Sequence, residues 1–185
     1  MNIKQLSVAV LATLSLSAIS GCAVNGSIRQ ENIIPAVSQT SNSKVAHNVR
    51  VGELKGFNGM NFFNNYSNLN KEEAKNAFTK SLEKAGLLAT NEQNARYTLG
   101  VNMKDTGENK GIVTTNWFGN ERNMIANYEV KDNQTNNVVL NKEVKTHKEI
   151  GSRLIGNYYL TERAELAEPT YKENFGEGIK AVQQL

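Results

Sequence analysis

Apolar positions at helical spacing predict an amphipathic helix between residues 70 and 88. Small or apolar side chains recur there every three or four residues and form one stripe: Ala74, Ala77, Phe78, Ser81, Leu82 and Ala85. Asn70 is placed to cap the N-terminus, and Glu73 stands three residues later, where its side chain can reach back to the cap. Gly86 suits a left-handed C-terminal cap. These signals together make this the best-defined helix in the chain.

A second helix is predicted at the end of the chain, from about Thr161 to Gln184. Its apolar stripe is Ala167, Tyr171, Phe175, Ile179 and Val182. Pro169 is disfavoured inside a helix, so we expect this helix to begin near Pro169 or to kink there. Gly176 and Gly178 weaken its middle by up to about 1 kcal/mol each relative to alanine.

Alternation of apolar and polar residues predicts four strands. Their approximate ranges are 45–54, 95–104, 122–131 and 138–148. The inward faces of the second and third strands are the clearest: Tyr97, Leu99, Val101 and Met103, then Met124, Ala126, Tyr128 and Val130. Residues 132–137 favour turn geometry, so the last two strands are expected to form a hairpin.

The order of elements is therefore strand, helix, three strands, helix. A sheet with one apolar face must bury that face against another layer. We therefore predict an α+β fold, in which an antiparallel sheet of about four strands carries two helices packed on one face (β-α-β-β-β-α). Hydrophobic residues make up 39% of the chain and charged residues 21%, which is typical of a globular protein. The net charge of +3 comes from interspersed residues, which argues against nucleic acid as a partner.

The first 21 residues have the three parts of an export signal. Lys4 supplies a positive charge, residues 6–19 form a short apolar region, and small residues follow. The apolar region is shorter than the roughly 20 residues that span a bilayer comfortably. The segment ends in Ile19-Ser20-Gly21-Cys22.

This ending resembles the lipobox of bacterial lipoproteins. The resemblance implies that residues 1–21 are removed as a signal peptide and that Cys22 becomes the mature N-terminus, with a diacylglycerol on its sulfur and a fatty acid such as palmitate on its amine. Several acyl chains give stable membrane anchoring where one chain is marginal. Cys22 is the single cysteine of the sequence and cannot form an internal disulfide, which lipidation explains. The alternative is an ordinary cysteine after a plain signal, or a buried thiol.

Ala23 follows the cysteine. In lipoproteins of the enteric type, Asp at this position favours retention at the inner membrane. The resemblance therefore implies a lipid-anchored protein of the bacterial outer membrane, on its periplasmic face. We expect residues 22–43 to form the lipidated cysteine and a flexible polar tether, whose apolar residues 33–37 are compatible with a short edge strand. Residues 44–185 are expected to form a single periplasmic α+β domain.

The element order and the anchor together resemble small periplasmic lipoproteins of the YajG type. The likeness is carried by residues 77–89, residues 97–104, the hairpin at 128–148 and the helix ending at 179–182. The LptE family of lipopolysaccharide-assembly lipoproteins has a similar order of elements.

We find no arrangement of residues that predicts catalysis, a metal site or a cofactor. His47 is expected to be half-buried on a strand face with three valines, and His147 to be solvated. Their spacing matches no zinc site, and no serine nucleophile motif is present. Glu162, Glu165 and Glu168 recur near a helix start, where the helix dipole explains them more simply than acid–base chemistry does.

Aromatic residues are the candidate partner-binding groups. Trp117 and Phe118 precede the third strand, and Tyr158 and Tyr159 precede the last helix. If both segments lie at one end of the sheet, they can form a patch for an envelope protein or a glycan, because aromatic residues are enriched at such contacts. The alternative is that they plug the end of the sheet. The same two interpretations, core cap or contact surface, apply to the aromatic residues within 56–70.

From the sequence we expect a non-catalytic protein that binds or scaffolds another component of the cell envelope. One alternative is an accessory subunit of lipopolysaccharide or outer-membrane assembly, by likeness to LptE. Another is an envelope enzyme, such as a cell-wall hydrolase or acyltransferase, for which the sequence nominates no residue.

Overall fold

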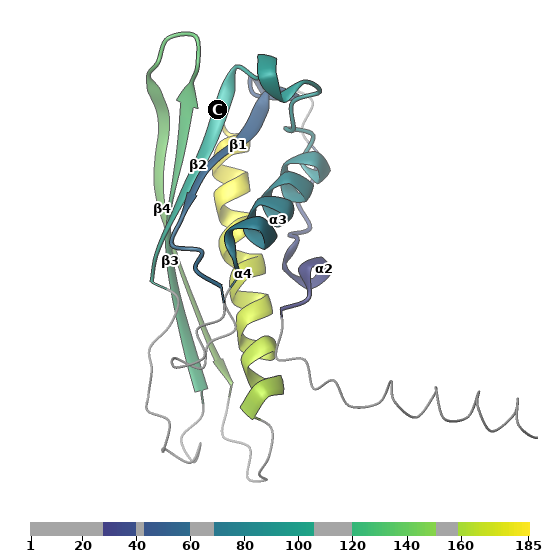
Figure 1. Ribbon diagram of the computed structural model, residues 1–185, viewed down its shortest axis with the longest axis vertical. Helices are drawn as coiled ribbons and strands as arrows, with labels where there is room; N and C mark the ends of the chain where they lie inside the picture. The colour runs from purple at the N-terminus through teal and green to yellow at the C-terminus, as the bar shows by residue number, and fades with distance from the viewer. Residues whose placement is uncertain (1–27, 40–42, 60–68, 106–119, 151–158) are drawn as a thin grey trace, which may run out of the picture.

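The computed structural model describes residues 28–39, 43–59, 69–105, 120–150 and 159–185, which form a four-stranded sheet with helices on one face (Figure 1). The elements are α2 (Gln30–Ile33), β1 (Val49–Lys55), α3 (Lys71–Lys84), a 3₁₀ turn (Glu92–Asn94), β2 (Tyr97–Asp105), β3 (Asn120–Asp132), β4 (Val138–Ile150) and α4 (Tyr159–Gln183). The α+β class and the order β-α-β-β-β-α are confirmed, with α2 and the 3₁₀ turn as additions.

The sheet is mixed, and the prediction of an antiparallel sheet was wrong at one edge. The strand order is β1-β2-β3-β4, with β2, β3 and β4 antiparallel to their neighbours. β1 is parallel to β2, with Val49 beside Tyr97 and Lys55 beside Asn102. The reason is that α3 carries the chain from the end of β1 back to the start of β2. Such a strand–helix–strand connection makes neighbouring strands parallel.

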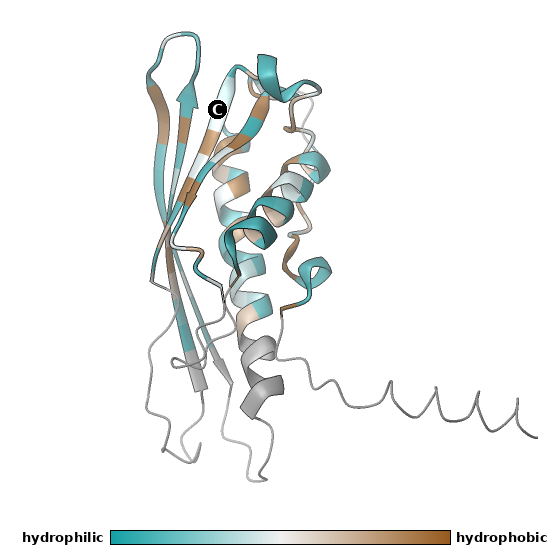
Figure 2. Ribbon diagram, in the orientation of Figure 1, coloured by the Kyte–Doolittle hydropathy of each residue, from teal (hydrophilic) through white to brown (hydrophobic). Residues whose placement is uncertain are grey.

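The predicted helix at residues 70–88 is confirmed as α3, together with both of its caps. The Asn70 side chain accepts a hydrogen bond from the Glu73 amide (2.9 Å), and the Asn70 amide donates to the Glu73 carboxylate (2.8 Å). Gly86 adopts a φ of 72°, which glycine tolerates best. All six stripe residues are buried, while most of α3 is hydrophilic (Figure 2).

The core lies between the sheet and the two long helices. Its centre is Phe78 of α3, whose ring centroid lies 4.1 Å from that of Phe175 and 6.1 Å from those of Phe57 and Tyr128. Every predicted inward residue of β2, β3 and α4 is buried. The apolar patterns therefore identified the core correctly. The described part of α4 continues through Pro169, which lies inside the helix.

At Gly178, α4 packs directly against the Tyr128 ring of the sheet. A Cβ atom at this position would lie 2.2 Å from the Tyr128 ring, so only glycine fits without a shift. The Tyr128 hydroxyl lies 2.7 Å from the Asn174 Oδ1 atom and 3.1 Å from the Asn174 carbonyl oxygen, and it donates its hydrogen there. The Asn174 side chain donates in turn to the Val144 carbonyl (3.2 Å). The glycine that weakens the helix locally is thus required by its packing.

Residues 28–39, which we name the strap, pack against the helices. Ile33 is fully buried, Ile34 is nearly so, and α2 contacts both α3 and α4. The prediction of a flexible tether extending to residue 43 was therefore wrong for residues 28–39. The short edge strand with which residues 33–37 were compatible does not form in the strap, where the short helix α2 ends at Ile33. Burial of the two isoleucines offsets the conformational entropy that the segment loses when it becomes ordered. The polar residues of the segment alone would not offset this loss.

Replacing Gly178 with alanine should destabilise the protein, because the new methyl group would overlap the Tyr128 ring. We expect a loss of about 1–3 kcal/mol in the free energy of unfolding, measured by chemical denaturation of the mature protein.

Gly176→Ala is the matched control on the same helix. Its Cβ would lie 3.3 Å from a single atom of Pro35, and alanine favours the helix by up to about 1 kcal/mol. We expect little change or a small gain. Equal stability of the two variants would contradict the close packing at Gly178.

Candidate functional site

Most of the residues predicted to form sites lie outside the described part of the chain. Cys22, Trp117, Phe118 and Tyr158 are among them. Tyr159 is the first residue of α4, but only its backbone position is described. Lipidation of Cys22 and the aromatic partner patch therefore stay predictions.

The segments that carry these aromatic residues are attached to strand ends that are neighbours in the sheet. Asn120, the first residue of β3, pairs with Ile150, the last residue of β4. Segments 106–119 and 151–158 therefore join the sheet at neighbouring strand ends, which we name the loop end. The opposite end, with the turn after Asp132, is the hairpin end (Figure 1). The described strands thus show that the attachment points of the two segments are neighbours in the sheet.

A buried arginine near the loop end escaped the sequence analysis. Arg122 of β3 is buried, and its Cζ atom lies 5.2 Å from the centroid of the Tyr171 ring, a cation–π geometry. The Tyr171 hydroxyl accepts a hydrogen bond from the Leu69 amide (3.3 Å). Burial raises the pKa of Tyr171, and the nearby Arg122 charge opposes that shift. The strand period could have revealed Arg122, because it places Arg122 on the same face as Met124.

A second buried polar group joins α4 to β3 and β4. The Asn174 side chain donates to Val144 as described above and lies 3.4 Å from the Thr146 hydroxyl. Burial raises the pKa of Tyr128 well above its ordinary value, so this phenol remains a neutral hydrogen-bond donor. The helical spacing of three from Tyr171 could have placed Asn174 on the buried face. The cluster is enclosed and internally satisfied, and its role is to fix α4 on the sheet.

Glu168 holds the strap. Its carboxylate accepts hydrogen bonds from the Arg29 amide (2.8 Å) and from the Asn32 side chain (2.6 Å). Of the three regularly spaced glutamates, this is the one whose side chain is described. Its contacts give it a structural role that the helix dipole does not supply.

Both histidines are exposed. His47 is exposed in a turn before β1, with a φ of 53°, so the prediction of a half-buried strand residue was wrong. The strand begins at Val49, two residues later. His147 is exposed, as predicted, with its Nδ1 atom 2.7 Å from the Asn123 side-chain oxygen. Within the described ranges, no three His, Cys, Asp or Glu side chains gather as a metal site would require.

Of the helices in the described segments, none combines the length and the apolar character needed to cross a bilayer.

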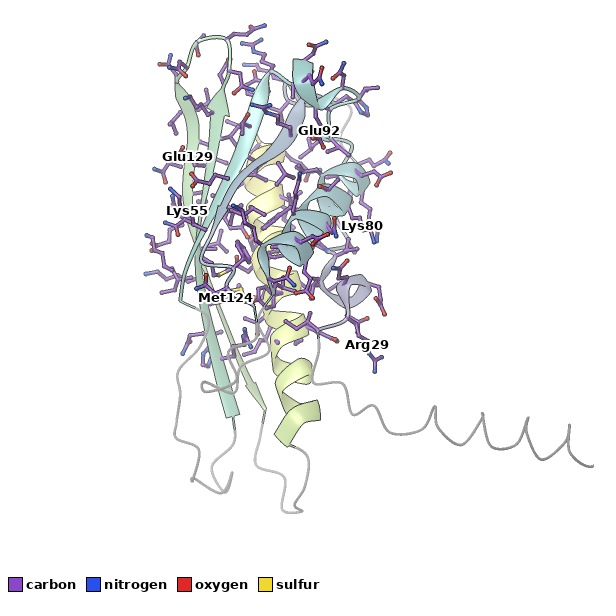
Figure 3. The ribbon with its side chains drawn as sticks, in the orientation of Figure 1. Arg29, Lys55, Lys80, Glu92, Met124 and Glu129 are labelled. Atoms are coloured by element: carbon purple, nitrogen blue, oxygen red, sulfur yellow. The ribbon has the colours of Figure 1, made fainter. Side chains whose placement is uncertain are left out.

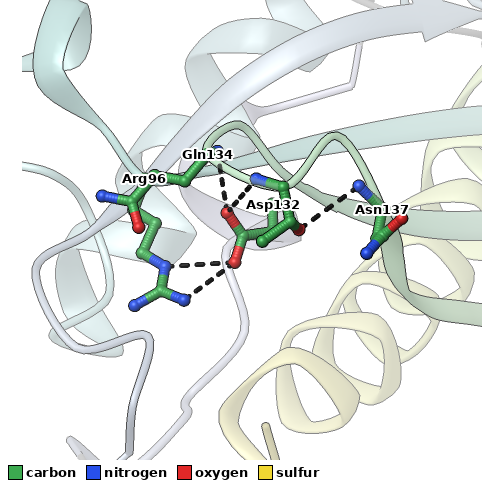
Figure 4. Close-up of polar contacts among 5 residues, drawn as sticks. Arg96, Asp132, Gln134 and Asn137 are labelled. Atoms are coloured by element: carbon green, nitrogen blue, oxygen red, sulfur yellow. Dashed lines mark hydrogen bonds and ion pairs between the residues drawn. The ribbon is translucent and has the colours of Figure 1, made fainter.

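At the hairpin end, a buried carboxylate organises the turn (Figure 4). Asp132 accepts hydrogen bonds from the Arg96 guanidinium at 2.9 and 3.1 Å and from the Gln134 amide at 2.8 Å. The Asp132 amide donates to the Asn137 carbonyl (2.9 Å) and closes the turn. The Arg96 hydrogen bonds are the main cause that lowers the pKa of Asp132, and the Gln134 amide adds to it.

The fold is similar to those of solved structures, although no sequence family matches. Comparison with protein-family models finds no match, and comparison with curated protein sequences finds none. A crystal structure of a Xanthomonas campestris protein described by the DUF330 family model is similar, with a TM-score of 0.54 at 9% identity over 83% of this chain and 91% of that one. A minor lipoprotein from Acinetobacter baumannii gives a TM-score of 0.50 at 13% identity, over 75% and 94% of the two chains. At these identities the likeness shows the fold alone.

The lowered pKa of Asp132 predicts a pH-dependent contribution to stability. A carboxyl group whose pKa is lower in the folded protein stabilises the fold at pH values above its ordinary pKa of 3.8. This contribution is lost as the pH falls through the pKa of the folded state. Asp132→Ala should therefore lower the melting temperature at pH 7, and the gap to the wild type should shrink near pH 3. The measurement is thermal unfolding of the mature protein at both pH values.

Glu129→Ala is the control, because it removes an exposed carboxylate from the same strand. A gap between wild type and Asp132→Ala that is unchanged at pH 3 would contradict the assigned role of the Arg96–Asp132 pair.

Proposed function

We propose that this protein is an outer-membrane lipoprotein, anchored through acylated Cys22 on the periplasmic face, that binds or scaffolds another component of the cell envelope without catalysis. The observation that carries the proposal is the lipobox sequence at residues 19–22, followed within a few residues by a folded domain. The similarity of that fold to a minor lipoprotein supports the lipoprotein part of this proposal.

Three polar groups of the described domain make contacts that support a structural rather than a catalytic role. Asn174 fastens α4 to the sheet, Glu168 fastens the strap, and Asp132 closes the hairpin turn. Each is engaged by partners within the domain. Catalytic acids and bases, in contrast, must present their reactive atoms to a substrate.

Partner binding is assigned in this proposal to the aromatic residues of the loop end. Trp117, Phe118, Tyr158 and Tyr159 belong to segments that join the sheet at neighbouring strand ends. A cluster of this composition is what protein and glycan contacts favour.

Cys22→Ser should abolish incorporation of labelled fatty acid and leave the protein unprocessed or soluble. Serine cannot accept the thioether-linked lipid, so the anchor is lost. Metabolic labelling and membrane fractionation are the measurements. Ala23→Ser is the control, because it changes the neighbouring side chain and keeps the thiol. Continued labelling of Cys22→Ser would contradict the lipobox assignment.

The binding role is tested by crosslinking the acylated protein in its native outer membrane and identifying captured proteins and glycans by mass spectrometry. The proposal expects a stoichiometric envelope partner whose capture falls when Trp117 and Tyr158 are replaced by alanine. If these replacements leave capture unchanged, the binding surface lies outside the loop end. Absence of any specific partner would contradict the binding role itself.

A further inference from the structure

The strap follows α4 over most of its described length. The Arg29 amide bonds to Glu168, Pro35 lies against Gly176, and the Gln183 side chain donates to the Ser38 carbonyl (2.8 Å). Both segments therefore run in the same direction. Because α4 begins at the loop end, the start of the strap also faces the loop end, and Arg29 lies in that half of the molecule (Figure 3).

This course of the strap limits the distance between the lipid and the folded domain. Only residues 23–27 separate Cys22 from Ile28, which packs against the core. Even a fully stretched chain over these six residue steps reaches about 20 Å. A tether that ran to residue 43 would reach several times further and would leave the domain free to turn.

We infer that the strap orients the domain on the membrane, with the loop end facing the lipid surface and the hairpin end facing the periplasm. The strap thereby sets which end of the domain approaches the bilayer. The inference rests on the proposed function, because it requires the lipid on Cys22.

The length of the domain opposes the inverted orientation. Along α4, Asn174 lies about 9 Å from Glu168 toward the hairpin end. Tyr128 hydrogen-bonds to Asn174, and Asp132 lies about 13 Å further along β3. The hairpin turn projects beyond Asp132 (Figure 1). The hairpin tip is thus more than about 22 Å from the start of the strap, beyond the reach of even a fully stretched tether.

The orientation can be measured by fluorescence energy transfer to the bilayer. Single-cysteine variants His147→Cys and Gln134→Cys place a donor on exposed positions of the same hairpin, near its two ends. Acylation removes the Cys22 thiol, so the new cysteine is the one reactive site. The acylated protein is reconstituted in phosphatidylethanolamine–phosphatidylglycerol vesicles that contain an acceptor-labelled lipid.

We expect transfer from position 147 to exceed that from position 134 by about twofold or more, because the two sites lie roughly 30 Å apart along the strand. A control chain carries about 20 added Gly and Ser residues after Ser27, which lengthens the tether and leaves the strap intact. In that control the two positions should give nearly equal transfer.

The outcomes separate this inference from the proposed function. Equal transfer from both positions of the acylated wild-type chain, or greater transfer from position 134, would overturn the orientation and leave the anchor standing. A difference that persists unchanged with the lengthened tether would overturn the role of the strap. Mass spectrometry that finds Cys22 without lipid would contradict the proposed function, and the inference with it.

Discussion

The contact of Gly178 with the Tyr128 ring is the constraint on which the rest of the molecule depends. It lets α4 approach the sheet closely enough for the Tyr128 hydroxyl to reach Asn174, and for Asn174 to reach β4. It also places Phe175 against Phe78, which joins the two helices into one layer. A larger residue at position 178 would separate these groups together, because protein interiors are close-packed and do not absorb an added methyl group freely.

Once α4 is fixed, it packs against the strap as well as against the sheet. Glu168, Gly176 and Gln183 contact the strap, while Tyr171 and Asn174 contact the sheet side. The helix is therefore buried on two sides, which explains why its buried residues exceed the single apolar stripe of an ordinary amphipathic helix. Because the strap packs on α4, the folded domain begins only a few residues after Cys22. The packing of the strap therefore connects the domain to its proposed place on the membrane.

The sequence predicted the elements whose signals are local. The caps and stripe of α3, the inward faces of β2 and β3 and the turn after Asp132 all follow from neighbouring residues. The features it missed depend on distant partners. The strap is polar in composition, and its burial depends on α4, more than 130 residues away. Arg122 is charged, so its residue type predicts a position on the surface. The strand period instead places it on the inward face, where it is buried. Three of the aromatic residues proposed to bind a partner, Trp117, Phe118 and Tyr158, lie outside the described ranges, where sequence remains the sole guide.

The docking of the strap is the central claim, and the stability of an Ile33→Ala variant tests it most directly. Ile33 is fully buried, and truncation of such a residue costs about 2 kcal/mol or more. The measurement is chemical denaturation of the mature protein, with Ala36→Ser as an exposed control on the same segment. The account predicts a loss of about 2 kcal/mol or more for Ile33→Ala and almost none for Ala36→Ser. If Ile33→Ala unfolds at the same denaturant concentration as the wild type, residues 28–39 are a free tether, and the account of the strap is contradicted.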